Sequence, residues 1–162
     1  MDEIVNYLNS VRREYSGQEL TKDSVAENPF KQLYSWIEDA VNAQVTDPAA
    51  MILSTVGSDN KPSARTVLIR GQEENGITFF TNYDSKKGQD LVSNPYVAIT
   101  FFWVELDRQI LITGRAEKIS YEASQKYFSN RPKESQISAI AYNQSGIVKN
   151  RKSLEDAYAA IE

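Results

Sequence analysis

A run of short apolar segments separated by turn residues constrains the fold of this chain more than any other feature. Residues 47–82 read DPAAMILSTVGSDNKPSARTVLIRGQEENGITFFTN. Three apolar segments of about six to eight residues alternate there with Gly, Asp and Asn, a pattern typical of strands joined as hairpins. We therefore expect an antiparallel meander that begins with these three strands.

Further strands and several helices follow from the remaining patterns. The segments at 95–104 and 108–120 predict two more strands, the second long enough to bend across a barrel. Helical spacing or start signals predict helices over 2–15, from Pro29 after an Asn28 N-cap, after an Asp84 N-cap, and over 121–129, 133–142 and 150–162. Antiparallel strands with helices packed at the ends indicate a small barrel of the α+β class.

The composition limits the chemistry that side chains can supply. The 162 residues suit one ordinary domain, and the chain contains neither cysteine nor histidine. Thiolate nucleophiles, disulfides, Ser-His-Asp arrangements and most zinc sites are thereby excluded. We expect no metal site, and we expect a bound cofactor to carry any redox or transfer chemistry.

The net charge of −4 argues against general binding to nucleic acids or anionic membranes. Any bound anion must therefore be met by a local cluster of cations. The sequence has no run that approaches the roughly 20 apolar residues of a membrane span, and its start lacks the pattern of a signal peptide. We expect a cytoplasmic protein.

The segment ARTVLIR, residues 64–70, carries two arginines. Because side chains alternate along a strand, Arg65 is expected to share a face with Val67 and Ile69, and Arg70 to point to the opposite side. One strand would then present a guanidinium on each face.

Two lysines, Lys86 and Lys87, begin the short helix predicted after Asp84. A helix N-terminus favours anions, so lysines there are unfavourable unless an anion rests on them. In a meander, the strand of Arg65 neighbours the segment that leads into this helix, and Arg65 and Lys87 would converge on one phosphate. The alternative is a pair of solvated lysines and an Arg65 held in a salt bridge.

A second cluster lies in the segment YFSNRPKESQ. Pro132 interrupts the helix, so a bend must bring Tyr127, Arg131 and Ser135 together. Two hydroxyls and a guanidinium make a phosphate cradle, and the alternative is a capped helix start with a structural arginine. Gln109, Gln144 and Ser145 could read a flavin or pyrimidine-like edge, or be ordinary surface polar residues.

Four segments resemble, in order and spacing, the motifs of the pyridoxamine 5′-phosphate oxidase family: RTVLIR, FFTNYDSKKGQDLVSNPYVAITFFW, DRQILITGRAEKIS, and YFSNRPKESQISA followed by NQS. The resemblance runs from about Arg12 to Ser145, and RREY at 12–15 resembles the family segment that closes over substrate. It implies a mainly β, α+β fold: an antiparallel FMN-binding split β-barrel with flanking helices, assembled as a homodimer with FMN at the subunit interface. On this basis we expect an N-terminal helix and mobile segment over 1–27, and the flavin-binding domain over 28–162.

The resemblance also assigns the site residues. Arg65, Lys86 and Lys87 match positions that meet the flavin phosphate, and the strand from Arg65 runs along the flavin. The positions implied for FMN are Arg65, Thr66, Val67, Leu68, Ile69, Arg70, Phe80, Thr81, Lys86, Lys87, Gln109, Gln144 and Ser145. The positions implied for substrate are Arg12, Tyr15, Arg70, Tyr127, Arg131 and Ser135. No side chain is assigned as catalytic, because the flavin carries the chemistry.

The implied activity belongs to vitamin B6 metabolism. Pyridoxine or pyridoxamine 5′-phosphate loses a hydride from its C4′ carbon to flavin N5, dioxygen reoxidises the flavin, and pyridoxal 5′-phosphate results. The protein's contribution is to stack the two rings by gripping both phosphates. Two alternatives stay open: a related flavin oxidase or reductase that acts on another heterocycle, as in phenazine-pathway relatives, and a non-catalytic binder of FMN or pyridoxal 5′-phosphate.

The chain departs from the family pattern in two places. Arg70 stands where the family commonly has lysine, and a planar guanidinium is expected to contact substrate differently from a point charge. The sequence ends at Glu162, whereas the family continues into a region with a tryptophan and an R-x-H element. Either this tail is missing from the sequence, or the chain is a shortened relative. We favour the first, because the other substrate positions are present.

Overall fold

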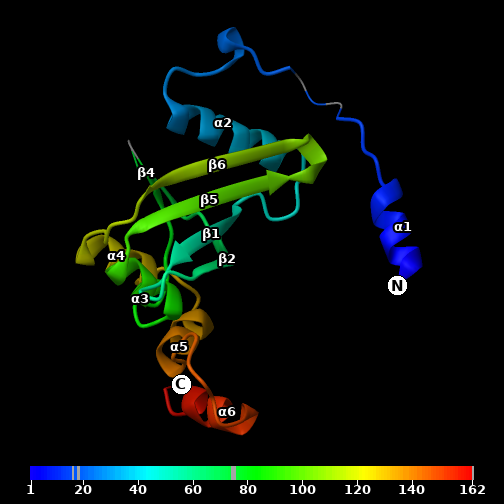
Figure 1. Ribbon diagram of the computed structural model, residues 1–162. Helices are drawn as coiled ribbons and strands as arrows, with labels where there is room; N and C mark the ends of the chain where they lie inside the picture. Colours follow the sequence, from blue (N-terminus) through cyan, green and yellow to red (C-terminus); the bar gives the residue numbers. More distant parts are fainter. Residues whose placement is uncertain (16, 18, 74–75, 162) are drawn as a thin grey trace. The chain divides into compact units, whose positions relative to one another are not determined.

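The computed structural model describes residues 1–15, 17, 19–73 and 76–161 (Figure 1). The chain divides into two compact units. One contains Met1–Pro48 and Phe102–Gln109, and the other contains Ala49–Phe101 and Ile110–Glu162. The predicted boundary after residue 27 stays a prediction.

The first unit carries the helices α1 (Asp2–Ser10), η1 (Lys22–Ser24), α2 (Pro29–Asn42) and η2 (Val104–Leu106). The predicted start of α2 is confirmed, because the Asn28 side chain accepts hydrogen bonds from the backbone N–H groups of Phe30 and Lys31. The predicted helix over 2–15 is wrong at its end: α1 stops at Ser10 and buries none of its residues. A short helix without tertiary packing is marginal in water, and α1 has no buried residues that could stabilise a longer helix.

The predicted antiparallel sheet is confirmed, but its order is not that of a simple meander. The strands β1 (Ala50–Val56), β2 (Pro62–Leu68), β5 (Tyr96–Trp103) and β6 (Arg108–Arg115) form one sheet in the order β2-β1-β5-β6. The third predicted strand instead becomes β4 (Gly76–Thr78), which pairs with β3 (Gly71–Glu73) in a separate two-stranded sheet. The strand β5 pairs with β1 on the side opposite β2, and it brings Ile99 and Phe101 into the core.

The second unit is organised around the buried face of β1. Met51, Leu53 and Thr55 alternate inward along this strand, and Leu53 lies opposite Arg65 on β2. The buried apolar residues of this unit are Met51, Leu53, Ile69, Ile99, Phe101 and Ile137. As the outer strand of the sheet, β2 leaves one edge open for a ligand.

The helices of the second unit are α3 (Lys86–Ser93), α4 (Tyr121–Ser129), α5 (Lys133–Ala141) and α6 (Arg151–Ala159). The prediction of 121–129 is confirmed, and the other predicted ranges are close, although α6 ends at Ala159 and β6 at Arg115. The helix α3 packs beside β1 (Figure 1). Its two lysines are therefore brought toward the sheet.

Candidate functional site

The N-terminus of α3 is held by Ser85, which is fully buried. Its hydroxyl accepts a hydrogen bond from the Gly88 N–H (3.3 Å) and donates one to the Asn82 carbonyl (2.6 Å). The predicted N-cap, Asp84, is wrong by one residue, because the helix begins at Lys86 and Ser85 occupies the cap position. This cap places Lys86 and Lys87 in the first turn of the helix.

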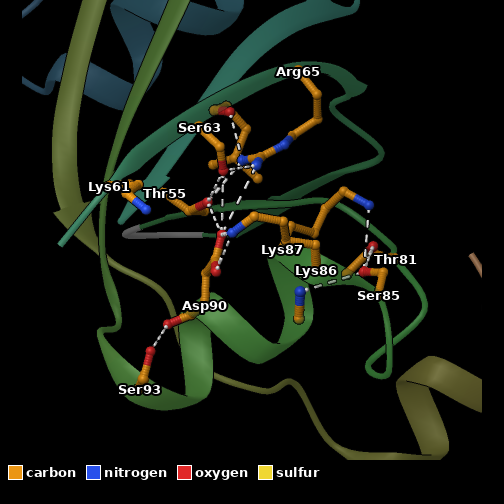
Figure 2. Close-up of polar contacts among 12 residues, drawn as sticks. Thr55, Lys61, Ser63, Arg65, Thr81, Ser85, Lys86, Lys87, Asp90 and Ser93 are labelled. Atoms are coloured by element: carbon orange, nitrogen blue, oxygen red, sulfur yellow. Dashed lines mark hydrogen bonds and ion pairs between the residues drawn. The ribbon is translucent and has the colours of Figure 1, made fainter. Parts of the chain in front are cut away.

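Lys87 is a buried cation, with only 8% of its surface exposed. Its Nζ donates hydrogen bonds to Gln144 Oε1 (2.8 Å) and Ser85 Oγ (3.4 Å), both of which are neutral (Figure 2). Among the described residues, no carboxylate lies within 4.0 Å of this ammonium group. Burial, and next the charge of Arg65, lower the pKa of Lys87 below its ordinary value of 10.5. A bound anion would stabilise the charged form of Lys87.

Arg65 reaches across from β2 toward the same region. Its Nη1 donates to the Leu53 carbonyl (3.0 Å) and to Thr55 Oγ1 (2.9 Å), and its Nη2 donates to Ser63 Oγ (Figure 2). The guanidinium is therefore fixed by neutral oxygens on β1 and β2, and its nearest carboxylate oxygen belongs to Asp90, 4.0 Å away.

A pocket of about 560 Å³ lies along β2 and the start of α3. Its lining contains eleven of the thirteen positions predicted for FMN: Arg65, Thr66, Val67, Leu68, Arg70, Phe80, Thr81, Lys86, Lys87, Gln144 and Ser145. The other two are Ile69, which is buried in the core, and Gln109, which belongs to the first unit. Arg65 and Lys87 line the same pocket, although the meander that suggested this is not present; that they bind one phosphate stays a prediction.

The two arginines of ARTVLIR do not serve opposite faces of one strand. Alternation holds along β2, where Arg65 is half-buried and its neighbour Thr66 is exposed. The strand ends at Leu68, however, and Arg70 follows in irregular chain whose N–H bonds the Thr78 carbonyl (2.8 Å). Both arginines consequently line the same pocket.

The predicted substrate residues fall into three groups. Tyr127 lines the pocket and stacks on Phe80, with ring centroids 3.5 Å apart and planes 4° from parallel. Arg131 and Ser135 lie at the bend between α4 and α5, where the Ser135 N–H bonds the Pro132 carbonyl (2.9 Å). Arg12 and Tyr15 are exposed residues of the first unit, and their role stays a prediction.

Three polar residues that sequence reasoning missed complete the site: Thr55, Ser63 and Asp90. Thr55 and Asp90 are buried, and Ser63 is half-buried between them and Arg65. Polar residues in strands are normally taken as solvent-facing, so Thr55 and Ser63 gave no signal. Asp90 did give one, since it follows Lys86 by four residues and such pairs face each other on a helix.

The lowered pKa of Lys87 predicts how the site responds to pH. We expect the affinity for FMN to fall as the pH rises through this pKa, starting below 10.5, because neutral Lys87 no longer attracts a phosphate. Riboflavin, which lacks the phosphate, is the control. Fluorescence titration at a series of pH values measures both affinities, and a ratio of FMN to riboflavin affinity that stays constant up to pH 10.5 would contradict the prediction.

No helix within the described ranges is long and apolar enough to cross a membrane. The described residues also hold no group of three or more carboxylate, histidine or cysteine side chains placed to bind a metal ion.

Comparison with known proteins identifies relatives over most of the chain. Residues 37–162 match the family described as pyridoxamine 5′-phosphate oxidase. A protein of Mannheimia succiniciproducens named pyridoxine/pyridoxamine 5′-phosphate oxidase is 46% identical over 95% of this chain and 73% of its own length. One of the same name from Herminiimonas arsenicoxydans is 43% identical over 94% of this chain and 72% of its own length.

Two solved structures confirm the predicted fold class. PhzG from Burkholderia lata 383, crystallised in complex with tetrahydrophenazine-1-carboxylic acid, has a TM-score of 0.84 and 26% identity over 90% of this chain and 73% of that one. An FMN-binding protein of Nostoc punctiforme related to pyridoxamine 5′-phosphate oxidase has a TM-score of 0.56 and 19% identity, over 82% of this chain and 71% of that one.

Proposed function

This chain belongs to the pyridoxamine 5′-phosphate oxidase family, and from that premise we propose that it is an FMN-dependent oxidase of pyridoxine or pyridoxamine 5′-phosphate, with dioxygen as electron acceptor. The observation that carries the proposal is Lys87, a buried ammonium group beside Arg65 with no carboxylate partner among the described residues. Such a charge is costly in a protein interior unless an anion meets it.

FMN is the cofactor, and the pocket fits it. Four cations line the pocket, Arg65, Arg70, Lys86 and Lys87, and no carboxylate among the described residues does, so a phosphate monoester dianion would meet an excess of positive charge even with Asp90 beside Lys86 and Arg65. A volume of about 560 Å³ lies within the range of small-molecule and cofactor sites. Bound FMN supplies the chemistry, as it accepts a hydride from substrate and passes the electrons to dioxygen.

The protein's own task is to hold two ligands against each other. The pocket-lining residues of β2 would run beside the flavin, and Gln144 would fix Lys87 while its amide N–H groups stay available as donors. Tyr127 on α4 lines this pocket. Arg131 and Ser135 follow it in the sequence, at the bend between α4 and α5. We assign those three residues and Arg70 to the substrate phosphate, because neither Arg131 nor Arg70 pairs with a carboxylate among the described side chains.

Replacing Arg131 with alanine tests this assignment. We expect the KM for pyridoxine 5′-phosphate to rise about 10- to 100-fold while the flavin content stays near normal, because a lost charge-assisted contact costs about 1.5–3 kcal/mol. Steady-state kinetics and the flavin absorbance per chain measure the two effects. Loss of flavin instead would mean that the two phosphate sites have been exchanged.

We further propose a homodimer with FMN at the interface. The outward face of the sheet exposes apolar side chains in the second unit, among them Ile52, Leu68 and Leu111, which are 40%, 37% and 65% exposed. Apolar side chains gathered on one sheet face are typical of subunit interfaces. Light scattering should give twice the chain mass of 18.3 kDa, and a monomer that retains FMN would refute this part.

A second candidate substrate is favoured by one specific observation. The structural relative with a TM-score of 0.84 binds a reduced phenazine carboxylic acid, which has no phosphate. Turnover of pyridoxine 5′-phosphate, pyridoxine and a reduced phenazine carboxylic acid should therefore be compared under the same conditions. The proposed function requires the phosphorylated substrate to be preferred by its kcat/KM. Preference for the phenazine would favour the second candidate, and tight binding of pyridoxal 5′-phosphate without turnover would indicate a non-catalytic binder.

A further inference from the structure

We propose that Asp90 is the positioning residue of the phosphate pocket: it fixes Lys86 and Arg65 in the arrangement that receives the phosphate. This assignment rests on the proposed FMN site and extends it by a residue that has no place among the predicted contacts. Asp90 itself is not expected to touch the cofactor, because a carboxylate would repel the phosphate.

The first argument comes from the direct contacts of Asp90. Its side chain is 6% exposed, and its Oδ1 accepts a hydrogen bond from Lys86 Nζ at 3.0 Å. Its Oδ2 accepts from Thr55 Oγ1 at 2.8 Å and from Ser63 Oγ at 3.3 Å (Figure 2). One carboxylate therefore ties α3 to both β1 and β2. It lines a neighbouring polar pocket, which shares Lys86 with the phosphate pocket.

The second argument concerns the direction of the hydrogen bonds. Thr55 and Ser63 each have a single hydroxyl proton, and both direct it to Asp90. Their lone pairs are thereby left to accept from the Arg65 guanidinium, which donates to both hydroxyls. If Asp90 lost its charge, one of the two hydroxyls could turn its proton toward the other, since the two oxygens lie 3.4 Å apart. Asp90 thus sets the orientation of Arg65 through two hydroxyls.

The third argument is the charge state. Burial favours the neutral form of Asp90, but the hydrogen bonds donated by Thr55 and Lys86 and the charge of Lys86 outweigh it, so the pKa of Asp90 lies below its ordinary value. The carboxylate is therefore ionised at neutral pH. Among the described residues Asp90 is the partner with which Lys86, whose side chain is 57% exposed, forms an ion pair, while Asp59 interacts with it only through its charge.

The proposal makes a prediction opposite in sign to that of simple charge counting. If Asp90 acted only through its electric field, removing its negative charge would strengthen phosphate binding. If it positions Arg65 and Lys86, removing the charge weakens phosphate binding, because both cations lose their orientation. A neutral variant of nearly the same shape separates the two.

The experiment compares FMN and riboflavin binding to the apoprotein of the 162-residue chain. For Asp90→Asn we expect an affinity for FMN at least about tenfold lower and an affinity for riboflavin within about twofold of the original. Asp84→Asn is the matched control, because it removes the same charge from an exposed residue. Asp84 lines the neighbouring polar pocket together with Lys86. The FMN affinity of this variant should be unchanged or slightly higher.

The outcomes are distinct. Unchanged or tighter FMN binding by Asp90→Asn, or an equal loss of both ligands, would overturn the positioning role. Should Asp90→Asn fail to fold, Ser63→Ala decides by the same readout, since it breaks one of the two hydroxyl links between Asp90 and Arg65 and should lower the FMN affinity selectively. If the unaltered protein bound FMN no better than riboflavin, the proposed phosphate pocket itself would fall.

Discussion

Replacing Gly88 with alanine is expected to destabilise the protein by about 2–3 kcal/mol and to abolish the retention of FMN. A Cβ at this position would lie 2.1 Å from the carbonyl oxygen of Tyr83 and 2.6 Å from its carbonyl carbon. Both atoms are backbone, so no side-chain rotation relieves the overlap. The chain from Tyr83 to Ser85 must therefore move, and with it the cap that places Lys86 and Lys87.

This expectation opposes helix propensity, which makes it informative. Alanine in a helix interior is normally more stable than glycine by about 0.5–1 kcal/mol. Gly114→Ala is the control, because a Cβ there meets nothing within 4 Å and its effect should stay within about 0.5 kcal/mol. Chemical denaturation and flavin content measure both variants. A Gly88→Ala protein that is more stable than the original and still yellow would refute the packing described for α3.

Replacing Lys87 with methionine is expected to weaken FMN binding about 10- to 100-fold, because a charge-assisted contact to phosphate is lost. The same change should stabilise the apoprotein by about 1 kcal/mol, since it removes a buried charge whose partners, Ser85 and Gln144, are neutral. Opposite effects on stability and binding are typical of a residue kept for its ligand.

Lys152→Met is the control for this variant, because Lys152 is 80% exposed on α6 and its one ion pair with the described residues is to Asp156. Replacing Lys152 should change neither the affinity for FMN nor the stability of the apoprotein measurably. Titration with FMN and denaturation of the apoprotein give the two numbers. If Lys87→Met lowered the stability of the apoprotein, Lys87 would be a structural residue and the central support for the phosphate pocket would be lost.

The sequence predicted most of the elements because their signals are local. Asn28 before Pro29 and Ser120 before α4 each cap a helix through hydrogen bonds within its first turn. These bonds do not depend on where the helix packs. Strand order is not local: β1 pairs with β5, some 45 residues away, because β5 brings Ile99 and Phe101 into the core. The pattern of hairpin turns alone could not reveal that choice.

The site was predicted unevenly for a related reason. Resemblance identified the residues that line the pocket, including Arg65 and Lys87, since these positions are defined by motifs. It did not reveal the polar residues that hold them, Thr55, Ser63 and Asp90, because their role depends on contacts among β1, β2 and α3. The N-cap at Asp84 was misplaced by one residue for another reason, since Asp84 and Ser85 are neighbours and both are favourable cap residues.

Anaerobic mixing of the FMN-loaded protein with pyridoxine 5′-phosphate tests the proposed oxidase activity most directly. We expect the visible absorbance of the flavin to be lost on mixing and to return when air is admitted. Pyridoxal 5′-phosphate and hydrogen peroxide should then form in equal amounts, because two electrons and two protons pass from the alcohol to dioxygen. A flavin-loaded protein whose absorbance does not change and which yields no aldehyde would contradict the oxidase function.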